Sequence, residues 1–345
     1  MTNQELSVNV PLSASPQTRV CSVEWMRVLF CLAIVLYHAD MVTTSSWKLF
    51  PFPMGYYCVE FFFVLGGFFL FYKRNSDPVA LSAYIKKLYI RLEPALLAAG
   101  VCSVCAGFIK FYELIYILIL STGWTLPFNI CWGDWFVSVY FWVSVLYTAL
   151  LHLKGKIKWL VILGLLCFFI GIYNPYQHNL NEFYFGWFPA SLARGIIGIG
   201  IGILTAAVCQ HIHISPQKRM RWMLTIVEAG ATFLVLQQIC CTVTLNSIQI
   251  QLVFAILLAM CMCEGGYLSA WLNRQHWICH ISKYTYSVFV MQMFTTFLVL
   301  KWKLNGLFGV LLALGLPIVL GILEYHLIEK RLMTWLRGNV QCLKY

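Results

Sequence analysis

Charged residues are scarce in this sequence. Aspartate, glutamate, lysine and arginine make up 11% of its 345 residues, whereas a soluble domain carries roughly 25%. Acidic residues are the scarcest, with 13 against 24 lysines and arginines. A chain so poor in charge cannot present a polar surface to water on all sides, which excludes an ordinary soluble globular domain.

Several signatures of other protein classes are also missing. The first 20 residues are polar and lack the apolar centre of a cleavable signal peptide. The 14 cysteines lie mostly inside apolar segments and show no spacing typical of a zinc site. No module that combines basic and aromatic residues indicates nucleic-acid binding. We therefore expect no metal, no bound cofactor and no nucleic-acid partner.

Long apolar segments dominate the chain, which is 61% hydrophobic. A helix needs about 20 apolar residues to cross a bilayer, and we count ten such segments. The sequence therefore predicts an all-α, polytopic membrane protein of about ten transmembrane helices. Residues 110–131 are ambiguous, because they can extend the third span or lie along the membrane interface. The predicted spans are 24–43, 55–73, 89–109, 132–153, 158–174, 188–209, 221–242, 247–264, 284–301 and 305–328.

Positive charge is distributed unevenly between the connecting segments. If the N-terminus is cytoplasmic, eighteen lysines and arginines lie inside and three lie outside. The positive-inside rule therefore places both termini in the cytoplasm. We expect a multi-pass protein of the plasma membrane. The corresponding domain prediction is a cytoplasmic tail at 1–23, a membrane domain at 24–328 and a cytoplasmic tail at 329–345.

The first predicted hairpin carries ionisable side chains that are unusual in a membrane. In "RVLFCLAIVLYH", Arg27 and His38 are eleven residues apart, so three helical turns place them on one face. His38 and Glu60 each lie about 7–8 Å below the outer ends of the first two spans, from the helical rise. We expect the two side chains to meet, either as a proton-transfer pair with His38 as base or as a structural hydrogen-bonded pair.

Basic residues gather at the opposite end of this hairpin. Arg27 lies about 16 Å from His38 along the helix axis, and Lys86, Lys87 and Arg91 follow the second span on the same side. These residues are either topology signals that reach lipid headgroups or a cluster that binds an anionic ligand. The second alternative predicts a site with two ends, with phosphate binding inside and proton transfer outside.

Three further features have both a structural and a functional interpretation. Gly198 and Gly202 form a G-x-x-x-G that favours close helix packing. Arg194, near the outer face, either reaches headgroups or contacts an anionic acceptor. Asp134 and Trp135 begin the fourth span in "CWGDWF", as part of an aromatic interface belt or of a sugar-binding site.

An ordered set of motifs resembles the acyltransferase type-three membrane family. Arg27 and His38 match its R-x10-H element, "VEFFFVLGGFF" its V-(D/E)-x-F-F-x-x-S-G-F element, and "KKLYIRLEP" its basic segment. "ISKYTYSVFVMQ" and "EYHLIEKRL" resemble its last two motifs. The sequence departs from the pattern where Gly66 replaces a serine, Leu88 an arginine and Gln292 a histidine, and where Lys330 and Arg331 stand in place of a common proline.

The resemblance implies transfer of an acyl group, commonly acetyl, from cytoplasmic acyl-CoA to a hydroxyl of an extracytoplasmic glycan or similar acceptor. It also implies that Arg27, Arg91 and Lys87 bind the phosphates of CoA. His38, with Glu60 as its partner, then either acts as base or briefly carries the acyl group itself. Tyr286 either orients ligand or packs. Asp134, Trp135, Arg194 and Tyr286 are then candidates for the acceptor side. Acyl-CoA is a cosubstrate, so no resident cofactor is needed.

Two other functions compete with this interpretation. In a proton-coupled transporter or exporter, the His38–Glu60 pair relays protons, but the charged hairpin at 24–73 has no counterpart in the second half of the chain. In a membrane sensor without catalysis, Leu88 and Gln292 reflect lost function. Transfer of label from acyl-CoA distinguishes the enzyme from both alternatives.

Overall fold

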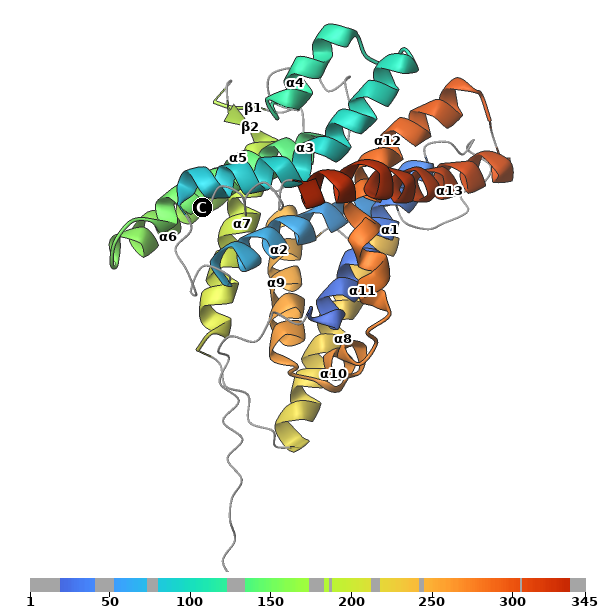
Figure 1. The fold of residues 1–345 in the computed structure, drawn as a ribbon. Helices are drawn as coiled ribbons and strands as arrows, with labels where there is room; N and C mark the ends of the chain where they lie inside the picture. The colour runs from blue at the N-terminus through green and yellow to red at the C-terminus, as the bar shows by residue number, and fades with distance from the viewer. Residues whose placement is uncertain are drawn as a thin grey trace, which may run out of the picture.

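The computed structural model describes residues 19–40, 53–72, 80–122, 134–173, 183–185, 188–211, 218–241, 245–304 and 306–335. Helices account for almost all of this part of the chain, and one two-stranded antiparallel hairpin is present (Figure 1). The predicted tails fall largely on residues 1–18 and 336–345, outside the described residues. In chain order the elements are α1 (Cys21–Ala39), η2 (Gly55–Tyr57), α2 (Cys58–Tyr72), α3 (Leu81–Cys105), η3 (Phe111–Glu113), α4 (Leu114–Leu118), α5 (Asp134–Leu151), α6 (Ile157–Ile172), β1 (Phe183–Tyr184), β2 (Phe188–Pro189), α7 (Ala190–Cys209), α8 (Lys218–Cys240), α9 (Ser247–Cys263), α10 (Tyr267–Asn273), α11 (Ile278–Ile281), η4 (Ser282–Tyr284), α12 (Thr285–Lys301), α13 (Gly306–Glu324) and η5 (Tyr325–Glu329).

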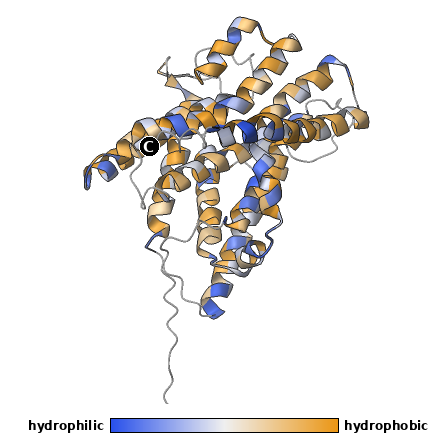
Figure 2. Cartoon of the chain, viewed as in Figure 1, coloured by the Kyte–Doolittle hydropathy of each residue, from blue (hydrophilic) through white to orange (hydrophobic). Residues whose placement is uncertain are grey.

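A helix lies in each of the ten segments that the sequence predicts as spans. Within the described residues, six helices are long and apolar enough to cross a membrane: α1, η2 with α2, α3, α7, α8, and α13 with its continuation to Trp335. α9 and α10 form a pair bent by 63°, and α5 and α6 are shorter apolar helices. Figure 2 shows apolar residues along most helices and polar residues toward several helix ends. The prediction of an all-α polytopic membrane protein is confirmed.

The third span ends earlier than one alternative for residues 110–131 requires. α3 stops at Cys105, and Gly107 adopts a positive φ of 71° that turns the chain out of the helix. The next described residues form η3 and α4, which pack back against the bundle: the hydroxyl of Tyr89 donates to the carbonyl oxygen of Leu118 at 2.9 Å. An extension of the third span is therefore wrong.

α2 and α7 cross at a glycine contact in the centre of the bundle. A Cβ atom on Gly202 would collide with the backbone of Val64 and Phe68, and one on Gly67 with the backbone of Ile199. Gly198 lies on the same face of α7, against Phe63. Since only glycine lets two backbones come this close, the structure confirms the packing interpretation of the G-x-x-x-G.

We predict that Gly202→Ala lowers stability by about 1–3 kcal/mol, because the new methyl group meets backbone that cannot rotate away. Gly230→Ala on α8 is the matched control, since nothing lies within 4 Å of a Cβ at that position. Relief of the helix cost of glycine makes this control neutral or more stable by up to about 1 kcal/mol. Thermal melting in detergent measures both. Equal melting of the two variants would contradict the tight crossing.

α1 and α12 run side by side in the same direction. Near the start of α1, the Sγ atoms of Cys21 and Cys279 are 3.4 Å apart, just before α12 begins. Ten residues further along α1, the thiol of Cys31 donates to the carbonyl oxygen of Thr285 at 3.3 Å. The second contact lies further along both segments than the first, so the two helices run in the same direction, and the contacts fix their register.

Candidate functional site

A buried ion pair joins α2 to α7. Nε of Arg194 donates to Oε1 of Glu60 at 2.7 Å, and a terminal nitrogen of the same guanidinium also pairs with that oxygen. The side-chain amide of Gln251, on α9, donates to Oε2 of Glu60 and to the backbone oxygen of Arg194. Glu60 is fully buried and Arg194 is 6% exposed. Both carboxylate oxygens are thus held by protein donors.

The expected contact between His38 and Glu60 is wrong. No hydrogen bond or ion pair joins them among the described residues, because Arg194 and Gln251 occupy the carboxylate. The predicted equal depth of the two residues is also wrong. The rings of Phe30 and Phe61 lie 4.8 Å apart and Gly55 lies against Tyr37, so Glu60 is about seven residues, or about 10 Å, from the level of His38 along the hairpin. Glu60 faces α7 and α9 instead.

Trp135 belongs to the same cluster. The guanidinium carbon of Arg194 lies 5.4 Å from the centre of the Trp135 ring, and the indole is buried. A buried ring on a paired arginine does not form an interface belt, and Arg194 does not reach the headgroups. Asp134 is the first residue of α5, and its side chain lies outside the described residues.

Four helices begin around this cluster. Glu60 is the third residue of α2, Trp135 the second of α5, Arg194 the fifth of α7 and Gln251 the fifth of α9. Short connections between successive antiparallel spans bring alternate helix starts to one end of a bundle. The polar cluster therefore lies close to the first residues of α2, α5, α7 and α9.

His38 lies against Gln292 of α12. The imidazole is half-buried and close to the Gln292 amide, which is 1% exposed. Neither the Nδ1 atom of His38 nor either amide atom of Gln292 has a hydrogen-bond partner in the part of the chain that the structure describes. These atoms retain capacity to bind a further polar group.

A charged cluster surrounds Arg27 about 16 Å from His38, from eleven residues of helical rise. The Arg27 guanidinium pairs with Glu24 at 2.8 Å and is 21% exposed. Arg91 lies within electrostatic range of Arg27, and Glu329 lies within range of both arginines. Ser287 donates to Oε2 of Glu329 at 3.0 Å. The structure thus brings together the two arginines that the sequence singles out.

The rest of this segment of α3 explains the departures from the motif. Leu88, at the position of an arginine in the pattern, is buried in the core, whereas Lys87 and Arg91 are exposed one turn apart. The hydroxyl of Tyr286 donates to the backbone oxygen of Leu92 at 2.6 Å. Tyr286 therefore lies close to Arg91, and its place on the acceptor side stays a prediction.

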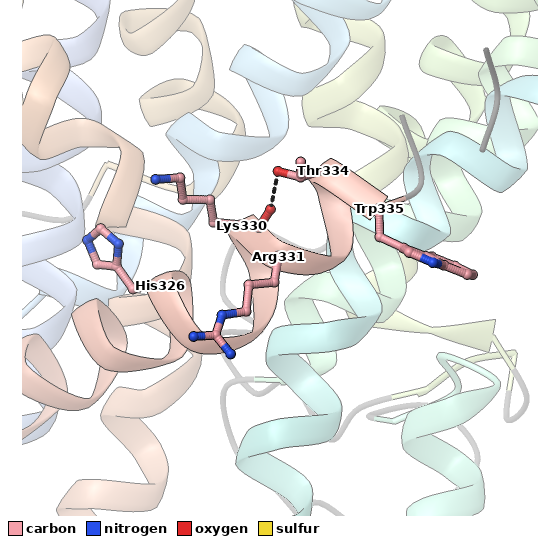
Figure 3. A pocket seen from close by; sticks show the side chains of 5 residues that line it. All are labelled: His326, Lys330, Arg331, Thr334 and Trp335. Carbon is pink, nitrogen blue, oxygen red and sulfur yellow. Dashed lines mark hydrogen bonds between the residues drawn. The ribbon is translucent and has the colours of Figure 1, made fainter. Parts of the chain in front are cut away.

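A surface hollow of about 470 Å³ adjoins this cluster near the end of the last helix. Its lining side chains are His326, Lys330, Arg331, Thr334 and Trp335, with the two basic chains extending from one helical turn (Figure 3). The hydroxyl of Thr334 donates to the backbone oxygen of Lys330 at 2.8 Å, so its hydrogen is not available to a ligand. The hollow adds cationic surface beside Glu329.

The geometry defines a class of protein: a helical membrane protein whose first helix connects a cationic cluster to a half-buried histidine. A family model described as an acyltransferase domain matches residues 22–324. The chain belongs to the acyltransferase type-three family and is a membrane acyltransferase. No curated protein and no solved structure matches the chain significantly.

Sequence reasoning missed three buried polar residues. Gln251 was not singled out, although it holds Glu60. Gln292 was recognised only as a departure from a motif. Glu324 is 4% exposed, and neither carboxylate oxygen has a hydrogen-bond partner among the described residues. The available signal was a single polar residue within an apolar helix, which in a membrane marks a partner or a cavity.

Proposed function

We propose that this protein is an O-acyltransferase that moves an acyl group, acetyl in the simplest case, from acyl-CoA to a hydroxyl. The donor binds from the cytoplasm, and the acceptor is an extracytoplasmic glycan or a similar molecule. His38 is the general base that takes the proton of the acceptor hydroxyl. The chain resides in the plasma membrane with both termini in the cytoplasm, as the charge distribution favours.

The separation of two kinds of chemistry along α1 carries the proposal. CoA has phosphates at one end and a thioester at the end of a long, slender arm. Arg27 and Arg91 lie together at one level of the bundle, and His38 lies three turns further along α1. A ligand with phosphates at the first level places its arm along α1 toward the second. Neither a proton relay nor a scaffold requires an anion site in line with a base.

Arg91 is the principal phosphate contact in this proposal. It is exposed and makes no hydrogen bond or ion pair in the part of the chain that the structure describes, so its donors are available. Arg27 is already paired with Glu24 and contributes mainly charge. Lys87 lies one turn from Arg91 on the same face of α3 and adds a weaker, flexible contact.

The observed contacts change which residues are candidates for binding the acceptor. Arg194 is paired with Glu60 and Trp135 packs against Arg194, so these two residues shape this end of the bundle and do not contact the acceptor directly. The acceptor hydroxyl instead approaches His38, whose imidazole is half-buried. Asp134 remains a candidate contact for a sugar at the start of α5.

Transfer of label tests the function directly. Membranes from cells that express the full chain are incubated with acetyl-CoA labelled in the acetyl group, and label is counted in glycan and lipid fractions. We expect labelled glycan, and we expect alkali to release the label from it as acetate, as it does from an ester. Uptake or export of protons without labelled product would support a transporter, and no product with any acyl-CoA would contradict the enzyme.

Arg91→Ala should weaken acyl-CoA binding by about 10- to 100-fold, because a charge-assisted phosphate contact contributes about 1.5–3 kcal/mol. Arg91→Lys should recover part of the affinity, since the charge remains but the planar fork does not. Lys86→Ala is the matched control: it removes one exposed positive charge from another face of α3. Calorimetry with a non-hydrolysable acyl-CoA measures the affinities. Equal affinity in Arg91→Ala and Lys86→Ala would make Arg91 a topology signal.

A further inference from the structure

The register of α1 and α12 places one side chain opposite the proposed base. His38 lies seven residues beyond Cys31, and Gln292 lies seven residues beyond Thr285, the residue that Cys31 contacts. Seven residues are about two helical turns. Because the helices run in the same direction, His38 and Gln292 reach the same level on facing sides, which agrees with their proximity.

The Gln292 amide is buried beside the His38 imidazole. It is 1% exposed, and neither its nitrogen nor its oxygen is bonded within the described residues. Such a buried amide costs roughly 1–3 kcal/mol relative to a bonded one. Native structures seldom keep an unbonded buried group without a reason. The cost is explained if the amide binds a polar atom of the reactants.

Few other donors can serve at this position. Among the described residues the unbonded buried donors are Trp25, His38, Ser144, Ser191 and Gln292. Trp25 lies thirteen residues before His38 on α1, about 20 Å away by helical rise. Ser144 and Ser191 belong to α5 and α7. The amide of Gln292 is therefore the donor beside the imidazole.

We infer that Gln292 is a catalytic residue whose side-chain N–H groups donate hydrogen bonds to the carbonyl oxygen of the acyl group during transfer. This inference rests on the proposed acyl-CoA-dependent function. It adds a second reacting-site residue on α12 to His38 on α1, so that the thioester is held between the two helices.

The chemical step requires such a donor. The acceptor oxygen attacks the thioester carbon, the hydroxyl proton moves to His38, and the π electron pair of the carbonyl moves to its oxygen. When the carbonyl re-forms, the C–S bond breaks, and the proton on His38 passes to the leaving sulfur. Ester and CoA thiol are the products. Negative charge on the carbonyl oxygen is greatest between these events, and a fixed donor stabilises it there most.

A neutral amide suits this role better than a second ionisable group. It does not titrate, so it donates to the oxygen throughout the pH range in which His38 must accept a proton. It also adds no positive charge that would repel the imidazolium formed during the reaction. The histidine found at this position of the motif carries a ring N–H, so the substitution Gln292→His retains a donor.

The test compares kcat with donor binding in the full-length protein. Gln292→Met keeps the length of the side chain and removes the donor, and Gln292→Glu keeps the shape and replaces the amide by an acceptor. With labelled acetyl-CoA, both should lower kcat by about 10²–10³-fold, with KM for the donor changed less than threefold. Gln292→His should be at least tenfold faster than Gln292→Met. Thr296→Val, one turn along α12 and equally buried, is the control and should keep kcat.

Two outcomes would overturn the inference and leave the proposed function intact. In one, Gln292→Met keeps kcat within threefold while His38→Ala is inactive. In the other, the loss of kcat in both Gln292 variants parallels a loss of folded protein and Gln292→His gives no recovery. If the wild-type protein transfers no label from any acyl-CoA, the proposed function fails and the role of Gln292 fails with it.

Discussion

Replacing His38 by alanine should lower the rate of acyl transfer by about 10²–10⁴-fold, the usual effect of removing a general base. The loss should appear in kcat, because the donor phosphates bind about three helical turns away around Arg27 and Arg91. Binding of acyl-CoA should therefore change less than threefold. The imidazole is half-buried and its Nδ1 atom has no partner among the described residues, so little stability should be lost with it.

His152→Ala is the control for this experiment. The Nδ1 atom of His152 contacts the carbonyl oxygen of Thr148 at 2.7 Å at the end of α5, well away from α12. Transfer of label, calorimetric binding of acyl-CoA and thermal melting are measured for both variants. A His38→Ala protein that binds donor and turns over like His152→Ala would show that the histidine only packs between helices.

Breaking the Glu60–Arg194 pair should have the largest effect on stability. Removal of one member of a buried ion pair leaves an uncompensated charge and costs about 3–5 kcal/mol. We expect Glu60→Gln and Arg194→Gln each to lower the free energy of unfolding by this amount. The double variant should be more stable than the sum of the two losses predicts, because two neutral amides leave no buried charge.

Unfolding by denaturant in mixed micelles measures the cycle, with Arg219→Gln as a control on an exposed arginine of α8. The interaction energy between the two sites is the quantity of interest. Strictly additive losses would show that the pair does not couple α2 to α7. Unchanged stability with lost transfer would instead make Glu60 a residue of the reaction.

The sequence allows the helical class and the position of each long helix to be predicted, because apolar length and charge determine where a helix can cross a membrane. The proximity of Arg27 to Arg91 was also predictable, because the predicted topology places both residues at the same border of the membrane. The partner of Glu60 was not. Counting residues from the predicted span ends places Glu60 level with His38, but the contacts of Phe30 with Phe61 and of Tyr37 with Gly55 set a different register. The orientation of α2 also depends on the glycine crossing with α7, which a single hairpin does not contain.

Gln292 is a second residue whose role could not be predicted from the sequence. As an isolated departure from a motif it suggests lost function. Its meaning changes once the contact between Cys31 and Thr285 sets the register of two helices more than 250 residues apart. Long-range register depends on side-chain shape along a whole interface, and such information is not read from local spacing.

Four helices begin around Glu60, and the electrostatic field at their N-termini acts differently on the two members of the ion pair. Each helix N-terminus carries a partial positive charge of about +0.5 from its aligned peptide dipoles. Those of α2, α5, α7 and α9 surround the same cluster. Their field favours the carboxylate of Glu60 and opposes the guanidinium of Arg194, so Glu60 retains electrostatic support when its partner is removed and Arg194 does not. Of the two single variants, Glu60→Gln should therefore be the more damaging to stability.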